Sequence, residues 1–320
     1  MKELISKILE KHVEIYGYVS VDEYIKKRAA YGKKDSFKRI PNFEKYKTIV
    51  VLGLAYPSKT VKHLGKGFGV LSRYAYNIDY HLTFKKVLLE IEKELTKLSI
   101  TSYSSVDVSD IYEKQAAVYA NLGYIGKNQL FINEKFGSYL NLATILIDIE
   151  LENEQVITVL DDCGDCRLCI DACPSNALDD GFDRVKCISN LSQEKNSLDK
   201  KEISYFKKVI YGCDICQIVC PKNNGIDFHL HQESEPTGIE NIDLIKLLKM
   251  SNKEFYIKYG NNACSWTGPL VLKRNALAVI ANQNLTQAIP EIKESMQKYQ
   301  GVSWYNETAI KVLKILKRSE

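Results

Sequence analysis

Cysteine is the residue type whose spacing in this sequence points most directly to chemistry. Eight of the nine cysteines lie between residues 163 and 220. Four of them follow one another at intervals of three, three and four residues in CGDCRLCIDACP, and CDICQIVCP supplies three more. In ferredoxin runs of this kind, three thiolates surround one 4Fe-4S cluster and the cysteine before proline binds a second cluster. The two runs therefore predict two 4Fe-4S clusters.

Exchange of the cysteines before proline divides the thiolates into two sets. The predicted ligands of the first cluster are Cys163, Cys166, Cys169 and Cys220. The second cluster needs one ligand from between the runs, so its predicted set is Cys173, Cys187, Cys213 and Cys216. Zinc also binds paired cysteines and is the alternative, although a four-ligand zinc site needs no repeated triplet with Cys-Pro. Cys264 is left over and is expected to be a structural thiol.

Helices and strands are expected to alternate in the part of the chain that precedes the cysteines, and to position the functional residues there. Apolar periodicity predicts helices and short apolar runs predict strands. The predicted elements are helices within 2–31 (the second near 21–30), a strand at 48–56, a helix at 76–98, a strand up to 107, a helix at 111–121, and strands at 129–133 and 140–151. Beyond residue 236 we expect helices at 242–250, 270–283, 289–299 and 305–317, and no strand. This order predicts an α+β fold that ends in an all-α region like an α-solenoid repeat.

Composition and charge exclude some classes of protein. With 320 residues, of which 45% are hydrophobic, the chain is large enough for two or three packed units. A net charge of +4 permits a nucleic-acid partner but does not require one. The first residues contain no apolar signal-peptide core, and the longest apolar run, at 48–56, is too short to span a bilayer. We therefore expect a cytoplasmic protein whose cysteines bind metal and do not form disulfides.

Segments outside the cysteine runs resemble a known enzyme family. They are RYAYNIDYH at 73–81, VDVSDIYEKQAAVYANLGYIGKNQLFI at 106–132, GSY at 137–139, CIS at 187–189, YGCDICQ at 211–217 and RNALAVIAN at 274–282. In this order, and over nearly the whole chain, they resemble epoxyqueuosine reductases. The resemblance implies a cobalamin-dependent oxidoreductase with two 4Fe-4S clusters. Such an enzyme reduces epoxyqueuosine to queuosine at the wobble position of a tRNA anticodon.

The family resemblance also implies a domain layout and partners. It places a mixed α/β cobalamin-binding domain at 1–155, a ferredoxin-like domain with both clusters at 156–235, and a HEAT-like helical domain at 236–320. The implied partners are tRNA carrying epoxyqueuosine and a low-potential electron donor such as a ferredoxin or flavodoxin. We expect a monomer, because one chain contains both clusters and the tRNA site.

The resemblance assigns the catalytic proton to Asp107. To donate a proton at neutral pH, this carboxyl would need a pKa raised by burial or by a neighbouring charge. His81 is the second catalytic candidate, because a histidine can relay or share a proton. The plainer interpretation of Asp107 is that it caps the helix that follows.

Cobalamin contacts follow from matching motif to motif, and tRNA contacts from basic and aromatic residues beside the second cysteine run and at the start of a C-terminal helix. The residues expected to touch cobalamin are Ser72, Asp107, Phe131, Leu142 and Glu194. The basic residues expected to contact tRNA phosphates are Lys200, Lys201, Lys207, Lys208, Lys273 and Arg274. Tyr205, Phe206 and Tyr211 are candidates for stacking on anticodon bases. A solvated helix face is the alternative interpretation of the lysines.

Two other functions fit part of the sequence. One is an iron-sulfur electron carrier that binds no cobalamin, and the other is a different corrinoid-dependent reductase. The sequence also departs from the family in two places. Residues 108–112 (VSDIY) differ from the commoner turn after the aspartate, which leaves the shape of that turn open, and the chain has fewer C-terminal helices than longer members.

Overall fold

The chain forms two compact units. The computed structural model describes residues 1–30, 32, 36–107, 110–151 and 163–317. The first unit comprises Met1–Tyr56, Tyr80–Arg167 and Cys220–Leu230, and the second comprises Pro57–Asp79, Leu168–Val219 and His231–Glu320. Within these described stretches, no helix is long and apolar enough to cross a membrane.

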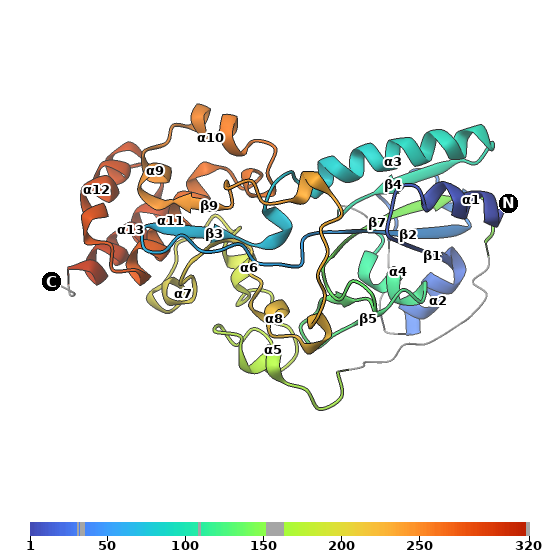
Figure 1. Ribbon diagram of the computed structural model, residues 1–320, viewed down its shortest axis with the longest axis horizontal. Helices are drawn as coiled ribbons and strands as arrows, with labels where there is room; N and C mark the ends of the chain where they lie inside the picture. The colour runs from blue at the N-terminus through green and yellow to red at the C-terminus, as the bar shows by residue number, and fades with distance from the viewer. Residues whose placement is uncertain (31, 33–35, 108–109, 152–162, 318–320) are drawn as a thin grey trace. The chain divides into compact units, whose positions relative to one another are not determined.

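A four-stranded antiparallel sheet forms the centre of the first unit (Figure 1). Its strands are β1 (Ile15–Ser20), β2 (Thr48–Ala55), β4 (Ser102–Ser105) and β7 (Leu140–Ile147), in the order β1-β2-β7-β4. Every residue of β2 is buried. The uninterrupted apolar run TIVVLGLA is typical of a strand that has partners on both edges and helices on both faces.

Helices cover both faces of this sheet. On one face lie α1 (Lys2–Leu9) and α3 (Tyr80–Lys97), and on the other lie α2 (Val21–Ala30) and α4 (Glu113–Tyr119). Alternate residues of β2 divide between the two cores, with Val50 in the first and Ile49 in the second, as the two-residue period of a strand requires. Since α3 begins at Tyr80 and β4 ends two residues before Asp107, these elements position both predicted catalytic side chains.

A short hairpin and a returning segment, Cys220–Leu230, complete the first unit. The hairpin pairs β5 (Tyr124–Ile125) with β6 (Phe131–Ile132). In the returning segment, Asn223 Oδ1 accepts a hydrogen bond from the Ser138 backbone N–H at 2.9 Å. Gly137 has a φ of 55°, and a Cβ there would lie 2.2 Å from Asn223 Oδ1. Only glycine allows this close approach.

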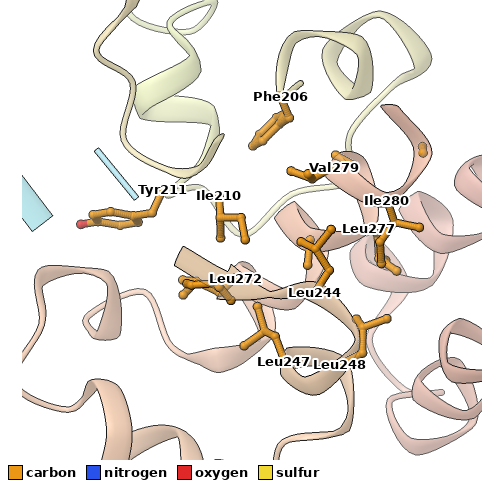
Figure 2. Close-up of a cluster of buried hydrophobic side chains, with 14 of the residues drawn as sticks. Phe206, Ile210, Tyr211, Leu244, Leu247, Leu248, Leu272, Leu277, Val279 and Ile280 are labelled. Carbon is orange, nitrogen blue, oxygen red and sulfur yellow. The ribbon is translucent and has the colours of Figure 1, made fainter. Parts of the chain in front are cut away.

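The second unit combines a small sheet with a group of helices. The strands β8 (Val209–Tyr211), β3 (Phe68–Leu71) and β9 (Asn241–Asp243) lie in the order β8-β3-β9. The helices that follow are α9 (Leu244–Lys249), α10 (Asn252–Tyr259), α11 (Pro269–Asn282), α12 (Ile289–Lys298) and α13 (Ser303–Leu316). Helix α11 contacts β8, α9 and α13 and is buried along most of its length. Figure 2 shows Leu272, Leu277, Val279 and Ile280 of α11 among apolar side chains of β8 and α9.

Short helices flank the cysteines of the second unit. They are α5 (Leu168–Asp171), α6 (Ile188–Leu191), α7 (Lys200–Tyr205) and α8 (Ile215–Ile218). Helix α5 packs against α8. Helix α7 begins with a capping box in which Asp199 and Glu202 accept each other's backbone N–H groups at 2.7 Å.

The mixed α+β architecture agrees with the predicted fold class, but several elements differ from the prediction, among them the strands β3, β5 and β8, which were not predicted. Strand β1 lies in a region predicted to be helical, β9 contradicts the strand-free C-terminal region, and α10 was not predicted. The short strands depend on pairing with residues far along the chain, which local periodicity does not reveal. The predicted domain boundary at residue 155 lies outside the described residues, and the boundary at 235 falls inside a continuous segment of the second unit.

Candidate functional site

Asp107 has an uncommon backbone conformation in the first unit. Its φ of 56° lies in the left-handed region, which aspartate adopts more readily than most other residues. Its backbone N–H donates to Oε1 of Glu113, the first residue of α4, at 2.7 Å. Backbone strain of this kind occurs preferentially at functional sites, where the surroundings hold it.

The Asp107 carboxylate is bound by two side chains from the start of α3. The Tyr80 hydroxyl donates to Oδ2, and His81 Nε2 lies 3.2 Å from the same oxygen. The two rings stack with their centroids 4.2 Å apart. The structure thus brings together the two residues that the sequence predicted as catalytic, Asp107 and His81, and adds Tyr80.

The raised pKa expected at Asp107 is found instead at Glu113. Burial alone would raise the pKa of Asp107, but hydrogen bonds from His81 and Tyr80 outweigh it, so this pKa lies below its ordinary value. Removal from water, followed by the neighbouring Asp107 charge, raises the pKa of Glu113 to about 8. Two carboxyl groups this close do not both ionise readily, and the proton stays on Glu113.

A lysine lies in the electrostatic field of this pair. Lys114 Nζ donates to the Gln129 carbonyl at 2.7 Å. Removal from water lowers the pKa of Lys114, while the charges of Asp107 and Glu113 act in the opposite direction. Tyr80, His81, Asp107, Glu113 and Lys114 therefore form a group of ionisable side chains able to hold and transfer a proton.

Two predicted cluster ligands pack together in the first unit. Cys163 and Cys220 lie in a small apolar group with Tyr124 of β5 and Ile132 of β6. Lys127, in the turn between these strands, donates from Nζ to the carbonyls of Gly164 and Cys166, the latter at 3.2 Å. The β5–β6 hairpin therefore holds the first cysteine loop by apolar packing and by a cation.

Buried thiols of the second unit affect one another's pKa. Burial raises the pKa of Cys213 to about 12, and the charges of Cys187 and Cys173 add to this rise. Burial likewise raises the pKa of Cys216, with contributions from Cys213, Cys187 and Cys169. Buried thiolates repel one another, and a bound metal centre both displaces their protons and compensates their charge. These thiols are the donor type that a 4Fe-4S cluster requires, although in the part of the chain that the structure describes no three ligating side chains are close enough to hold a single metal ion.

Comparison with known proteins identifies the family. A profile described as "4Fe-4S double cluster binding domain" matches residues 162–223, and a profile described as "Epoxyqueuosine reductase QueG" matches residues 41–108. The epoxyqueuosine reductase of Lactococcus garvieae is 34% identical over 261 residues, which span 79% of this chain and 74% of that protein. The chain belongs to the epoxyqueuosine reductase family. The predicted family and the predicted double 4Fe-4S domain are both confirmed.

Solved epoxyqueuosine reductases share the fold. The Streptococcus thermophilus enzyme is 30% identical, with a TM-score of 0.86 over 99% of this chain and 90% of that one. A second structure, solved with an epoxyqueuosine-modified tRNA-Tyr stem loop, is 28% identical, with a TM-score of 0.80 over 99% of this chain and 98% of that one. The family uses cobalamin and iron-sulfur clusters, so this chain is an oxidoreductase with those cofactors.

The residues predicted to touch cobalamin have different surroundings. Phe131 and Leu142 are buried in the core of the first unit beneath α2 and α4. In the second unit, Ser72 is 3% exposed, and among the described residues its Oγ has no hydrogen-bond partner. A buried hydroxyl of this kind fits contact with a polar ligand. Glu194 is exposed, and its backbone carbonyl accepts from Arg274.

The residues predicted to contact tRNA fall into two groups. Lys200, Lys201, Lys207 and Lys208 are exposed and remain available to phosphate. The prediction is wrong for Lys273 and Arg274, which are 0% exposed and donate to backbone carbonyls of the second unit. Among the stacking candidates, Phe206 and Tyr211 are also buried in the core shown in Figure 2, while Tyr205 is partly exposed.

Sequence reasoning missed Tyr80, Glu113 and Lys127. Each was present in a quoted segment, in DYH, YEK or GKN, without a role assigned to it. Their importance depends on contacts between residues that are 6 to 39 positions apart. Only the position of Tyr80, next to His81, offered a signal in the sequence.

Proposed function

We propose that this chain reduces epoxyqueuosine to queuosine in the anticodon of tRNA. The observation that carries the proposal is the match, over nearly the whole chain, to an epoxyqueuosine reductase solved with an epoxyqueuosine-modified tRNA stem loop. The group around Asp107 supports it, because this reaction needs a proton source as well as a reductant.

The reaction removes the epoxide oxygen as water. Both carbon–oxygen bonds of the epoxide break and a carbon–carbon double bond forms, with the uptake of two electrons and two protons. Amino-acid side chains are not reductants of the required strength, and cobalamin and the iron-sulfur clusters would supply the electrons when bound. The side chains have to orient the epoxide, exclude water and deliver protons.

Asp107 is the proposed proton donor to the departing oxygen, with His81 as the relay. Because the pKa of Asp107 is low, Asp107 must receive a proton before each delivery, and Glu113 holds a proton at neutral pH. Tyr80 and His81 fix the orientation of the Asp107 carboxylate. The proposed cobalamin contacts remain Ser72, Asp107, Phe131, Leu142 and Glu194.

The ligand sets of the two clusters keep the assignment made from the sequence. In the second set, Cys173, Cys187, Cys213 and Cys216, the effects of Cys173 and Cys187 on the pKa of Cys213 support the assignment. Cys169 of the first set also acts on the pKa of Cys216. We further propose the three-domain division with a HEAT-like C-terminal region, a ferredoxin or flavodoxin as the electron donor, and a monomer acting on tRNA in the cytoplasm.

A direct assay tests the proposed reaction. The protein, purified without oxygen and supplied with cobalamin and a strong reductant, should convert epoxyqueuosine in tRNA to queuosine, measured by mass analysis of the nucleosides. Iron, sulfide and corrinoid contents are measured on the same sample. Full loading without queuosine would refute the proposed reaction. Iron-sulfur loading without any affinity for cobalamin would favour an electron carrier, and turnover of other corrinoid substrates alone would favour a different reductase.

A further inference from the structure

Arg274 has a position that the expected tRNA contact does not explain. It lies in α11, is 0% exposed, and its guanidinium donates to the carbonyls of Leu191 at 2.6 Å, Glu194 at 2.7 Å and Asn196 at 2.8 Å. These three carbonyls belong to the end of α6 and the loop that follows it. One side chain therefore fixes the course of the chain immediately after Cys187, the N-cap residue of α6.

Asn275 extends this contact to a second segment of the chain, strand β8. Its Oδ1 accepts from Arg274 Nε at 3.0 Å and from Nη2 at 2.6 Å. Its Nδ2 donates to the carbonyls of Ser192 at 2.8 Å and Ile210 at 2.7 Å. The Asn275 amide thus joins the segment after Cys187 to the middle of β8, and it is itself 0% exposed.

A third contact connects the same two segments next to a cysteine. The backbone N–H of Gly212 donates to Ser192 Oγ at 3.0 Å. Gly212 directly precedes Cys213, and its φ of 70° is the left-handed conformation that glycine adopts without strain. Cys187 and Cys213, two predicted ligands of the second cluster, are therefore the ends of two segments that Arg274 and Asn275 tie together.

A purely structural role does not account well for these residues. A buried guanidinium is costly to remove from water, and apolar side chains of similar volume often stabilise a core equally well or better. What the planar guanidinium adds is five donors in a fixed geometry, which suits several backbone carbonyls at once. The carbonyls that it binds lie on the segment that follows a cluster ligand.

We propose that Arg274 and Asn275 are positioning residues for the second 4Fe-4S cluster. They hold the segments that begin at Cys187 and end at Cys213 at the spacing that the cluster requires. This inference rests on the proposed ligand set of the second cluster, and it assigns part of the C-terminal helical region to cluster assembly in place of tRNA binding.

The matched control is the preceding residue of the same helix. Lys273 is also a cation with 0% exposure, but it donates to the Met250 carbonyl at 2.6 Å and to the Tyr299 hydroxyl at 3.1 Å, away from the cysteine segments. Arg274→Met and Lys273→Met each replace a buried cation by an unbranched apolar side chain. Iron and sulfide are measured after anaerobic purification of the full chain, together with the electron paramagnetic resonance spectrum of the reduced clusters.

The wild type is expected to contain about eight irons per chain, Arg274→Met about four, with one cluster signal lost or shifted, and Lys273→Met about eight. Full loading and an unchanged spectrum in Arg274→Met would overturn the inference, as would equal losses in both variants. If Arg274→Met does not fold, Asn275→Ala, which removes only the bridging amide, should show the same selective loss. A wild type that contains only one cluster would instead contradict the proposed ligand set.

Discussion

The backbone N–H of Asp107 donates to the Glu113 carboxyl at 2.7 Å, and the two carboxyl groups hold one proton between them at neutral pH. His81 and Tyr80 stabilise the charge on Asp107, which leaves Glu113 as the protonated partner. A donor with a low pKa is a stronger acid once it is protonated, and its neighbour supplies a proton reserve. This pairing has consequences that pH profiles can measure.

Glu113→Gln should abolish the fall in activity at alkaline pH, the alkaline limb of the pH–activity profile. In the wild type, Glu113 loses its proton as the pH rises through about 8 and then repels the Asp107 charge, so turnover should fall. Glutamine keeps an oxygen that can accept the Asp107 N–H but does not titrate. We expect about tenfold lower turnover at neutral pH and no limb near pH 8. An unchanged limb in the variant would assign it to another group.

The same substitution should change how stability depends on pH. The pKa of Glu113 is higher in the folded chain than its ordinary value of 4.5. The folded state therefore binds the extra proton between these values, and its stability falls as the pH rises from about 4.5 to about 8. Glu113→Gln should lack this fall, so its free energy of unfolding relative to the wild type should increase across that range. Urea unfolding at several pH values measures the effect.

Asp107→Asn should abolish proton delivery while leaving cofactor loading intact. The amide has a similar shape but no acidic proton, and loss of a general acid typically lowers the rate by about 10² to 10⁴. Iron, sulfide and corrinoid contents should match those of the wild type. Turnover within a few-fold of the wild type would exclude Asp107 as the donor.

The sequence predicted the cofactors better than it predicted the surroundings of the active site. The cysteine spacing is set by the geometry of a cluster and is visible locally, as is the apolar run of β2. The proton reserve is not visible in this way, because Glu113 becomes one only through its contact with Asp107 in a left-handed turn. Arg274 was misassigned for a related reason. A charged residue in sequence favours the surface, and only its backbone carbonyl partners explain its burial.

Tyr80→Phe should raise the pH at which the protein unfolds in acid. The Tyr80 hydroxyl is one of the donors that lower the Asp107 pKa, so its loss should raise that pKa. A carboxyl whose pKa is lower in the folded than in the unfolded state stabilises the fold above its unfolded-state pKa, and this stability is lost as the pH falls. The variant loses part of this contribution, so its acid unfolding should begin at a higher pH. Tyr103 donates its hydroxyl to the Arg39 carbonyl in the same unit, so Tyr103→Phe is the control and should leave the pH of acid unfolding unchanged.

Lys127→Met should weaken the first cysteine loop. Its ammonium donates to the carbonyls of Gly164 and Cys166, and loss of a charged hydrogen bond of this kind costs about 1.5 kcal/mol, or roughly tenfold in an equilibrium constant. We expect a chelator to remove iron about tenfold faster from the variant. The control is Lys135→Met, because Lys135 lies over the Phe136 ring in the same unit. Equal rates for both variants would show that Lys127 does not protect the loop.

The exposed lysines near α7 should account for part of the salt dependence of tRNA binding. Lys207 and Lys208 are adjacent and exposed, as are Lys85 and Lys86 on α3, which form a matched pair with no predicted contact. Each phosphate contact that is lost should reduce the slope of log affinity against log salt concentration by about 0.7 on a single-stranded loop. Replacing Lys207 and Lys208 by alanine should therefore reduce the slope and weaken binding at low salt, whereas the α3 pair should not. Lys273→Met should also bind normally, because its ammonium is buried among carbonyl and hydroxyl partners. Identical slopes for the two lysine pairs would place the phosphate contacts elsewhere.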